Sequence, residues 1–180
     1  KVAEISYSLD PNNPDSVMNM AYLYRISDDE VKYREFVYKA VEINPHHPRS
    51  LSAKGMLYLN ECDYDNSIEL LTRAYETNPK TVPFLEIMLL FCHLGKNDWI
   101  SAHQSVDRSM RENDHSRFHA FKAIILAHEG KNDESKLWLA KYQENRPEIK
   151  TLEDYEKVVP AVNQDVKNIL LDGVRKAGLK

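Results

Sequence analysis

Histidine is the residue type in this sequence whose spacing most suggests metal chemistry. The 180-residue chain carries 7 histidines, including the neighbours His46 and His47 and the pair His115 and His119. An i, i+4 spacing places two imidazoles on one helical face, but no glutamate completes the H-E-x-x-H arrangement of a zinc protease. His46 and His47 fall in a predicted turn, and His115 falls at a predicted helix start. We therefore interpret these histidines as turn and capping residues and predict no metal site.

A thiol nucleophile is the second chemistry that the residue types would allow. Cys92 precedes His93, but adjacent helical residues point about 100° apart, so this imidazole cannot take the thiol proton directly. Cys62 lies too far from Cys92 for a C-x-x-C motif, and the 5 isolated glycines form no phosphate-binding loop. The sequence therefore predicts a protein that is not an enzyme and that holds no cofactor.

Charge and hydropathy narrow the classes of partner. The formal net charge is -4, and no basic block provides the surface of a direct nucleic-acid binder. The longest apolar stretch, residues 84–94, is interrupted by Glu86 and His93 and is shorter than the roughly 20 residues of a membrane span. With 29% charged residues and only 5 glycines, the composition favours a helical protein with short connections. We expect a protein or an extended peptide segment as partner, without direct nucleic-acid contact or membrane insertion.

The elements that position these residues repeat along the chain. Prolines stand at the equally spaced positions Pro11, Pro45 and Pro79, and Pro147 follows after twice the same interval. The position midway between Pro79 and Pro147, where the same spacing would place a proline, is occupied by Asn113. Asp or Asn precedes each of the first three prolines, and a residue before proline avoids the helical region. The period therefore indicates a helical hairpin that recurs roughly every 34 residues.

Small and aromatic residues recur at fixed places within this period. The repeats begin at Pro14, Pro48 and Ser116, and the recurring positions are 8, 11, 15, 17, 20 and 27. The residues at these positions are Ala21, Tyr24 and Ala40 in the first repeat, Gly55, Tyr58, Tyr64 and Ala74 in the second, and Ala123, Gly130 and Ser135 in the fourth. This pattern resembles the tetratricopeptide repeat (TPR), a pair of antiparallel helices with the same period. Small residues suit places where helix A and helix B of a hairpin cross closely.

The resemblance implies an all-α fold, a right-handed superhelix of antiparallel helix hairpins. It divides the chain into the last turns of a truncated preceding repeat (1-13), four repeats (14-47, 48-81, 82-115 and 116-147) and C-terminal capping helices (148-180). In the third repeat Leu89 holds position 8 and Ala102 lies one residue late, so we expect an altered turn there. Ser27 and Glu30 predict a capping box at the second helix of the first repeat.

The N-terminal segment has the pattern of a helix B whose helix A is absent. Val2, Ile5 and Leu9 form an apolar edge that another helix would cover. We therefore expect the natural protein to continue upstream of Lys1.

The C-terminal segment has the pattern of a cap, with Gly178 at the left-handed position after the last turn and Leu179 returning to Val174. Its ending, LLDGVRKAGL, is similar to the segment that closes the helical-repeat regions of bacterial class III nucleotide cyclases and winged-helix transcriptional regulators. Val174 stands where that pattern has leucine. The similarity implies the C-terminal regulatory or binding module of a larger bacterial signalling or transcription-regulating protein, with any catalytic domain upstream.

In the TPR family, helix A of each repeat lines a concave groove that receives a peptide. The resemblance therefore implies a binding face formed by Met18, Tyr22, Arg25, Arg49, Ser52, Met56, Asn60, Glu86, Leu90, His93, Arg117, Ala120, Ile124 and His128. Family members that bind chaperone tails have Lys and Asn where this chain has Met18 and Tyr22, so we expect a different peptide.

Three functional hypotheses follow. The leading one is a scaffold that binds a protein, an extended peptide or the parent protein's own effector domain. The second is self-association, as a homodimer through the apolar N-terminal edge. An enzyme is third, because no nucleophile, base and orienting group stand at suitable spacing. We expect a cytoplasmic location, with the extracytoplasmic part of a membrane-anchored protein as the alternative.

Overall fold

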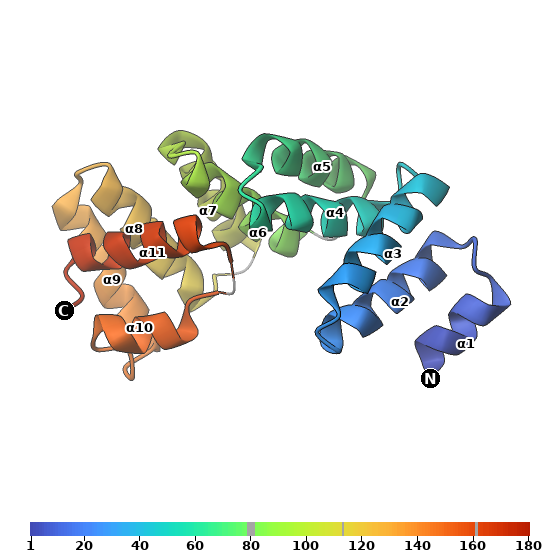
Figure 1. Ribbon diagram of the computed structural model, residues 1–180. Helices are drawn as coiled ribbons and strands as arrows, with labels where there is room; N and C mark the ends of the chain where they lie inside the picture. The colour runs from blue at the N-terminus through green and yellow to red at the C-terminus, as the bar shows by residue number, and fades with distance from the viewer. Residues whose placement is uncertain (79–81, 113, 161) are drawn as a thin grey trace. The chain divides into compact units, whose positions relative to one another are not determined.

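The computed structural model describes residues 1–78, 82–112, 114–160 and 162–180, without the side chains of residues 82 and 83. In these ranges the chain forms eleven α-helices and no strand, so the all-α prediction is confirmed there (Figure 1). Two compact units, Lys1–Thr81 and Val82–Lys180, are described in turn. Pro79 and Asn113, which belong to the repeating pattern, lie outside the described residues.

The first unit consists of α1 and two helical hairpins. Its helices are α1 (Val2–Leu9), the pair α2 (Pro14–Ile26) and α3 (Glu30–Ile43), and the pair α4 (Pro48–Asn60) and α5 (Tyr64–Thr77). Pro14 and Pro48 begin their helices, where a missing N–H costs no intrahelical hydrogen bond. One apolar cluster joins the hairpins; its fully buried members include Val17, Met18, Ala21, Val37, Ala40, Ala53 and Leu57.

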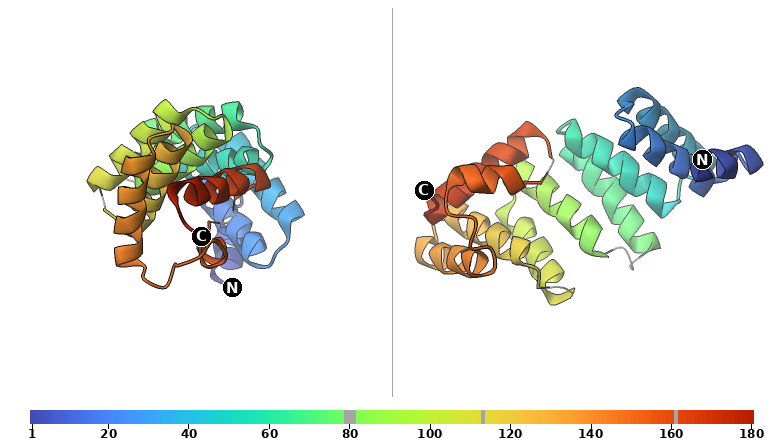
Figure 2. Two further views of the ribbon diagram at one scale, coloured as in Figure 1. Left: turned by 90° about the vertical axis from the view of Figure 1, so that its left-hand side faces the viewer. Right: turned by 90° about the horizontal axis from the view of Figure 1, so that it is seen from below.

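The second unit contains two further hairpins and a two-helix C-terminal segment. Its helices are α6 (Val82–Gly95), α7 (Trp99–Glu112), α8 (Ser116–His128), α9 (Asn132–Asn145), α10 (Leu152–Val158) and α11 (Gln164–Ala177). Three helices, α7, α9 and α11, pack against α8 (Figure 2). Nine of the 13 residues of α8 are buried. This central position explains why α8 has apolar residues on every side.

Four hairpins share one geometry in the turn from helix A to helix B. The residue two places before helix B has a left-handed backbone in each, with φ of 59° at Asp28, 60° at Cys62, 55° at Asn97 and 77° at Gly130. The next residue donates its N–H to the carbonyl five residues earlier, as Asp63 does to Tyr58 at 2.9 Å. Left-handed backbone favours glycine, and asparagine or aspartate tolerates it, so Cys62 is the unusual member of the set.

The expected alteration of the third turn is wrong. α6 has 14 residues, whereas α2, α4 and α8 have 13, so the additional residue lies in helix A. Asn97 keeps the left-handed conformation, and the Asp98 carboxylate accepts the N–H of Ser101 at 3.1 Å. The whole turn has therefore moved one residue along the chain, which accounts for the late position of Ala102.

The predicted capping box at Ser27 and Glu30 is also wrong. Asp29 is the N-cap of α3, and its carboxylate accepts the N–H of Lys32 at 3.1 Å. Ser27 instead ends α2, with its hydroxyl donating to the Tyr24 carbonyl at 3.1 Å. The left-handed turn places helix B directly after Asp29, so serine lies two residues too early to cap it.

Small residues lie where helices A and B cross. A Cβ at Gly55 would lie 3.0 Å from two side-chain atoms of Leu71. Ser67 donates its hydroxyl to the Gly55 carbonyl at 2.7 Å, and Ser135 makes the same bond to the Ala123 carbonyl at 2.8 Å. A serine at position 20 therefore ties helix B to helix A in two repeats.

The end of α11 forms as predicted. Gly178 has φ of 113°, and the Leu179 N–H donates to the Val174 carbonyl at 3.0 Å. Leu179 is buried, which completes the apolar contact expected of this cap. Among the helices of the described ranges, none combines the length and apolar character needed to cross a bilayer.

Candidate functional site

The predicted groove residues divide by burial into two sets. Those that retain accessible surface are Tyr22, Arg25, Arg49, Ser52, Met56, Asn60, His93, Arg117 and His128. Those that are buried are Met18, Glu86, Leu90, Ala120 and Ile124. The structure corrects the expectation that the buried set faces a peptide, because these side chains fill the spaces between helices. They belong to the packing of the chain, and contact with a ligand would require a rearrangement.

The first unit carries most of the accessible set, on α2 and α4. Met56 and Tyr22 are partly buried and offer apolar contact, while Asn60 is exposed at the end of α4. The hydroxyl of Ser52 donates to the Pro48 carbonyl at 2.7 Å, so its proton is engaged within the helix. This face therefore offers apolar surface beside polar groups at the junction of two A helices.

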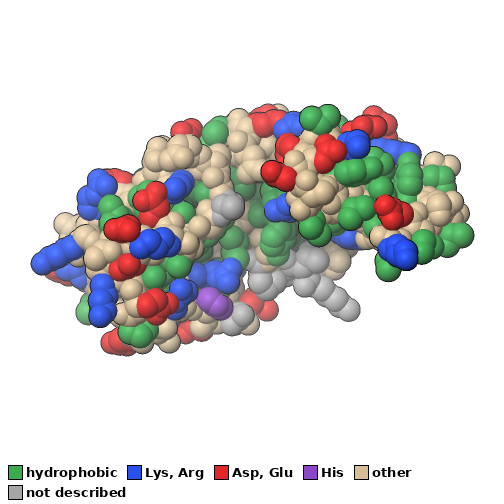
Figure 3. Space-filling model, turned by 60° about the horizontal axis from the view of Figure 1, so that its bottom comes forward, with side chains coloured by type: hydrophobic (Ala, Val, Ile, Leu, Met, Phe, Trp, Pro, Cys, Tyr) green, Lys and Arg blue, Asp and Glu red, His purple; other side chains and the backbone are tan. Residues whose placement is uncertain are grey.

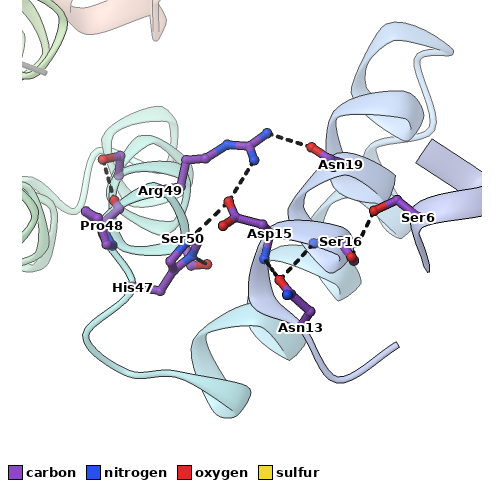
Figure 4. Close-up of polar contacts among 10 residues, drawn as sticks. Ser6, Asn13, Asp15, Ser16, Asn19, His47, Pro48, Arg49 and Ser50 are labelled. Carbon is purple, nitrogen blue, oxygen red and sulfur yellow. Dashed lines mark hydrogen bonds and ion pairs between the residues drawn. The ribbon is translucent and has the colours of Figure 1, made fainter. Parts of the chain in front are cut away.

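Arg49 is held in place across this junction (Figure 4). Its Nη1 donates to Asp15 Oδ1 at 3.0 Å, and its Nη2 donates to Asn19 Oδ1 at 3.0 Å. The guanidinium carbon also lies 5.1 Å from the centre of the Tyr22 ring. Such an exposed ion pair contributes at most about 1 kcal/mol to stability. Two of the five N–H donors are used in these bonds, so the group is positioned to donate to a carboxylate or carbonyl of a ligand.

His47 supports the same junction from the start of α4. Its Nε2 lies 3.4 Å from Asp15 Oδ1, and its Nδ1 lies 2.7 Å from the Ser50 hydroxyl oxygen (Figure 4). Burial lowers the pKa of His47, although the neighbouring Asp15 carboxylate opposes this shift. His47 holds the N-cap position of α4, but its side chain makes no capping hydrogen bond to the helix backbone, so the capping part of the interpretation is wrong for this histidine.

In the second unit, α11 packs against two of the four groove residues predicted on α8, Ile124 and His128. A Cβ on Gly173 would lie only 2.4 Å from Cγ2 of Ile124, so the α11 backbone rests directly on this side chain. His128 donates from Nε2 to the Ile169 carbonyl at 3.1 Å. α11 contacts α6 and α9 as well. The predicted capping segment therefore occupies the surface at Ile124 and His128 that a peptide was expected to contact.

Two other predicted residues, Glu86 and His93, serve the packing of α6. The Glu86 carboxylate is 2% exposed and accepts hydrogen bonds from Arg108 Nε at 2.6 Å and Nη2 at 3.0 Å. Burial lowers the pKa of His93, whose Nδ1 lies 3.8 Å from Asp98 Oδ2. The bidentate pair joins α6 to α7 and neutralises a buried charge.

A hollow between α8, α9 and the α10 segment contains Arg117. It is lined by His115, Arg117, Ala120, Phe121, Tyr142, Arg146, Tyr155, Val158 and Pro160. The floor is aromatic and the rim is cationic, and Glu148 already binds the Arg146 guanidinium at 2.5 Å. Burial lowers the pKa of His115, and the charge of Arg117 adds to that shift. This combination of aromatic and cationic side chains suits a ligand in which an apolar group lies next to a carboxylate.

A second hollow lies between α1 and α2, and sequence reasoning identified only part of it. Its lining residues are Val2, Ala3, Asn19, Tyr22, Leu23 and Ile26. The exposed fractions are 83% for Val2, 80% for Leu9 and 85% for Ile26. Hydrophobic side chains gather over this end of the first unit (Figure 3). Of the lining residues, Val2 was predicted as part of the apolar edge and Tyr22 as a groove residue. The other four were not predicted, and the signal that would have found them is a comparison of equivalent positions in successive repeats.

Reactive side chains do not converge in the part of the chain that the structure describes. No three histidine, cysteine, aspartate or glutamate side chains there are placed to share a metal ion. Cys92 is buried in the core, and Cys62 is exposed in a turn. The accessible groups therefore support recognition by hydrogen bonds and apolar contact.

The model of the tetratricopeptide repeat family matches residues 48–81, which include the hairpin of α4 and α5. A TPR is thus present in this chain, as the spacing of prolines and small residues predicts. Comparison with the curated proteins gave no match.

Solved structures share the fold over nearly the whole chain. YrrB, described as a TPR protein with an unusual peptide-binding site, is 16% identical with a TM-score of 0.70, covering 98% of this chain and 91% of YrrB. PilW, a type IV pilus biogenesis factor, is 17% identical with a TM-score of 0.71, covering 97% of this chain and 78% of PilW. The pilF protein of Pseudomonas aeruginosa is 14% identical with a TM-score of 0.66, and the match covers 93% of this chain and 76% of pilF. The similarity of these structures shows that the chain has a TPR-type helical-repeat fold.

Proposed function

We propose that this chain is a non-catalytic protein-interaction scaffold whose binding face is formed by α2 and α4. The TPR fold supports the class of function. One observation supports the face: Arg49 is held by Asp15 and Asn19 at 3.0 Å each, beside the accessible Tyr22 and Met56. On α8, α11 packs against Ile124 and His128, so the first unit offers more accessible positions and is the better candidate.

The chemistry of this face suits an extended protein segment that pairs an acceptor group with an apolar side chain. Arg49 would bind the carboxylate or carbonyl, and Met56 and Tyr22 would contact the apolar group. YrrB, which has the same type of fold, is described as peptide-binding, and this supports a peptide ligand here.

Selection of peptides from a displayed random library, with the intact chain as bait, tests the proposal. Selected peptides should bind Arg49→Ala and Met56→Ala at least tenfold more weakly than the wild type. Arg175→Ala is the matched control, because it removes an exposed arginine of the second unit that lies outside the predicted binding face and outside both hollows. Peptides that bind Arg49→Ala and Met56→Ala as tightly as the wild type would place the binding face elsewhere.

We further propose that the module is the C-terminal regulatory part of a larger cytoplasmic bacterial signalling or transcription-regulating protein and that it binds the effector domain of that protein. The closing segment at residues 170–179 supports this proposal through its similarity to the endings of cyclase and winged-helix regulator repeat regions. Sequencing the natural gene tests it. A nucleotide cyclase or winged-helix domain upstream of Lys1 is the expected result, and an upstream region made only of repeats would contradict the regulatory role.

Self-association is a second candidate function, favoured by the exposed apolar residues of α1. Ile5 and Leu9 are 56% and 80% exposed, and α1 has no buried residue. Sedimentation over a range of concentrations, with Ile5→Asp and Leu9→Asp, tests this candidate. A dimer that persists in both variants would exclude the α1 edge.

A further inference from the structure

The hollow between α8, α9 and the α10 segment, which we call the Arg117 hollow, encloses about 260 Å³. In the described ranges α10 packs against α11 and makes no close backbone contact with α8 or α9, which leaves a gap between them. A side chain, Tyr155, reaches across this gap and meets the Tyr142 ring with 6.1 Å between centroids. Pockets for drug-sized ligands begin at roughly 300 Å³, so this hollow suits a smaller molecule.

Aromatic rings form the floor of the Arg117 hollow, and other rings hold them in place. Phe121, Tyr142 and Tyr155 line the hollow and are buried. Phe121 packs edge-to-face on Phe91 of α6 at 5.7 Å, and the rings of Tyr142 and Tyr155 meet at 85°. Aromatic pairs favour this geometry, so the rings are fixed by their neighbours. A ligand ring can therefore bind on the floor without reorganising it.

The rim of the hollow carries positive charge. The described lining has two arginines, Arg117 and Arg146, and no carboxylate. Glu148 pairs with Arg146 from outside the lining. In the part of the chain that the structure describes, Arg117 has no acidic partner, and its Nε donates to His115 Nδ1 at 3.4 Å. One positive charge at the rim is therefore not neutralised by the protein.

Both arginine charges act at one place on the rim, the imidazole of His115. Desolvation lowers the pKa of His115, and the charges of Arg117 and Arg146 lower it further. His115 is also the N-cap of α8, and the amino end of a helix favours a nearby anion. The rim therefore concentrates positive potential beside the aromatic floor.

The Arg117 hollow ends where α11 packs on α8. Ala120 lines the hollow, and Ile124 lies one turn further along the same face of the helix. The α11 backbone rests on Ile124, because a Cβ on Gly173 would lie 2.4 Å from its Cγ2. A ligand in the hollow therefore cannot continue along this face of α8, as an extended peptide would. This limit favours a free small molecule over a segment of a protein.

We propose that the Arg117 hollow binds a small aromatic monocarboxylic acid, with its carboxylate held by Arg117 and Arg146 and its ring on the aromatic floor. A guanidinium group binds a carboxylate through paired N–H donors, and one positive charge at the rim matches one carboxylate. The proposal goes beyond the scaffold function, because the hollow lies in the second unit and shares no residue with the face of α2 and α4. A bound acid would join the α10 segment to α8 and α9 and so stabilise the second unit.

Titration of phenylacetate into the isotope-labelled intact chain, followed by the NMR signals of its backbone amides, tests the proposal. Saturable shifts should appear around His115, Tyr142 and Tyr155, with a Kd of roughly 1 mM, as suits a ligand of this size. Phenylacetamide has the same shape without the charge and should bind at least tenfold more weakly. Acetate, which lacks the ring, should also bind at least tenfold more weakly. Phenylacetate should raise the urea concentration needed to unfold the second unit, and phenylacetamide should not.

Matched variants separate the hollow from general attraction of an anion. Arg117→Gln changes an exposed side chain, so it leaves the fold intact, and it should weaken phenylacetate binding at least tenfold. Arg175→Gln removes an exposed arginine of the same unit outside the hollow and should bind like the wild type. Arg49→Ala should also bind phenylacetate normally, which keeps this result distinct from the test of the face on α2 and α4.

Three outcomes would overturn the proposal. The first is absence of saturable shifts up to roughly 10 mM phenylacetate, ten times the expected Kd. The second is equal binding by the wild type and Arg117→Gln, or equal binding of phenylacetate and phenylacetamide, which would show that the carboxylate is not recognised. The third is binding of the peptide Gly-Gly-Phe at least tenfold more tightly than phenylacetate and dependent on Arg117, which would make the end of a protein chain the ligand.

Discussion

The Nε2–H of His128 donates to the Ile169 carbonyl at 3.1 Å and so joins α8 to α11. The ring also stacks on Trp99, with centroids 4.6 Å apart and planes inclined by 6°. Because a carbonyl oxygen only accepts hydrogen bonds, Nε2 carries the proton, and Nδ1 faces the Lys176 ammonium at 3.4 Å. Burial lowers the pKa of His128, and the positive charge of Lys176 lowers it further. The hydrogen bond to Ile169 and the negative charge of Asp172 act in the opposite direction. The surroundings of His128 therefore favour its neutral form.

The first prediction is that the second unit loses stability as the pH falls below about 6.5, the usual histidine pKa. A histidine whose pKa is lowered by folding binds its proton more readily in the unfolded chain. Its contribution is therefore complete above the unfolded pKa and is lost as the pH falls towards the folded pKa. Urea unfolding followed by tryptophan fluorescence at pH 8 and pH 5.5 measures this, since both tryptophans, Trp99 and Trp138, lie in the second unit.

His128→Gln should reduce the difference in unfolding free energy between these two pH values, because glutamine does not titrate. His93, whose pKa is also lowered by burial, should account for part of the remaining difference. An unchanged pH dependence in His128→Gln would show that this imidazole is not the responsible group.

The second prediction concerns the contact between α11 and α8. Gly173→Ala should destabilise the second unit by about 1–3 kcal/mol, because its methyl group would meet Ile124 at 2.4 Å. Tryptophan fluorescence during urea unfolding measures the loss. Asn168→Ala, on the exposed side of α11, is the control and should change stability by less than about 0.5 kcal/mol. Equal stability of Gly173→Ala and the wild type would contradict the close packing described here.

The third prediction concerns the buried carboxylate of Glu86. Arg108→Met should destabilise the second unit by about 3 kcal/mol, because it leaves a carboxylate with 2% exposure without its bidentate partner. The double variant Glu86→Leu, Arg108→Met should recover most of that loss, since it removes the buried charge as well. Additive losses in the double-mutant cycle would mean that the two side chains are not coupled.

The fourth prediction concerns the serine that ties the two helices of the fourth repeat. Ser135→Ala should cost about 1 kcal/mol, because it removes the 2.8 Å hydrogen bond to the Ala123 carbonyl while leaving the packing unchanged. Thermal unfolding monitored by tryptophan fluorescence measures the effect. The exposed neighbour Lys136→Ala should have no comparable effect, and similar losses in both variants would reflect a change in helix α9 rather than the hydrogen bond.

Helix positions followed well from the sequence where the controlling interactions are local. The regular spacing of the prolines and the small residues at Gly55, Ala123 and Ser135 predicted hairpins that the structure contains. Caps were harder to predict, because Ser27 and Asp29 are both good N-cap residues and the left-handed turn at Asp28 decides between them. In the third repeat the late Ala102 led to the prediction of an altered turn, whereas the additional residue lies in helix A and the turn keeps its conformation.

Accessibility of the candidate face could not be predicted in the same way. The position of a residue within its repeat predicts the side of helix A on which it lies, as for Met18 and Ile124. The position does not predict whether a segment far away in the sequence packs against that side. Ile124 is covered by α11, which lies far along the chain from α8, and this contact depends on Gly173 allowing close approach.

By itself, the sequence determined the class of fold, the hairpin period and the apolar edge at Val2 and Leu9, because these follow from the spacing of prolines, small residues and apolar residues along single helices. Tertiary structure decided that α11 would cover part of α8, that Arg49 would be fixed between Asp15 and Asn19, and that a hollow would lie between α1 and α2. Each of these depends on which helices approach one another and how closely, and that is set by packing between segments far apart in the chain.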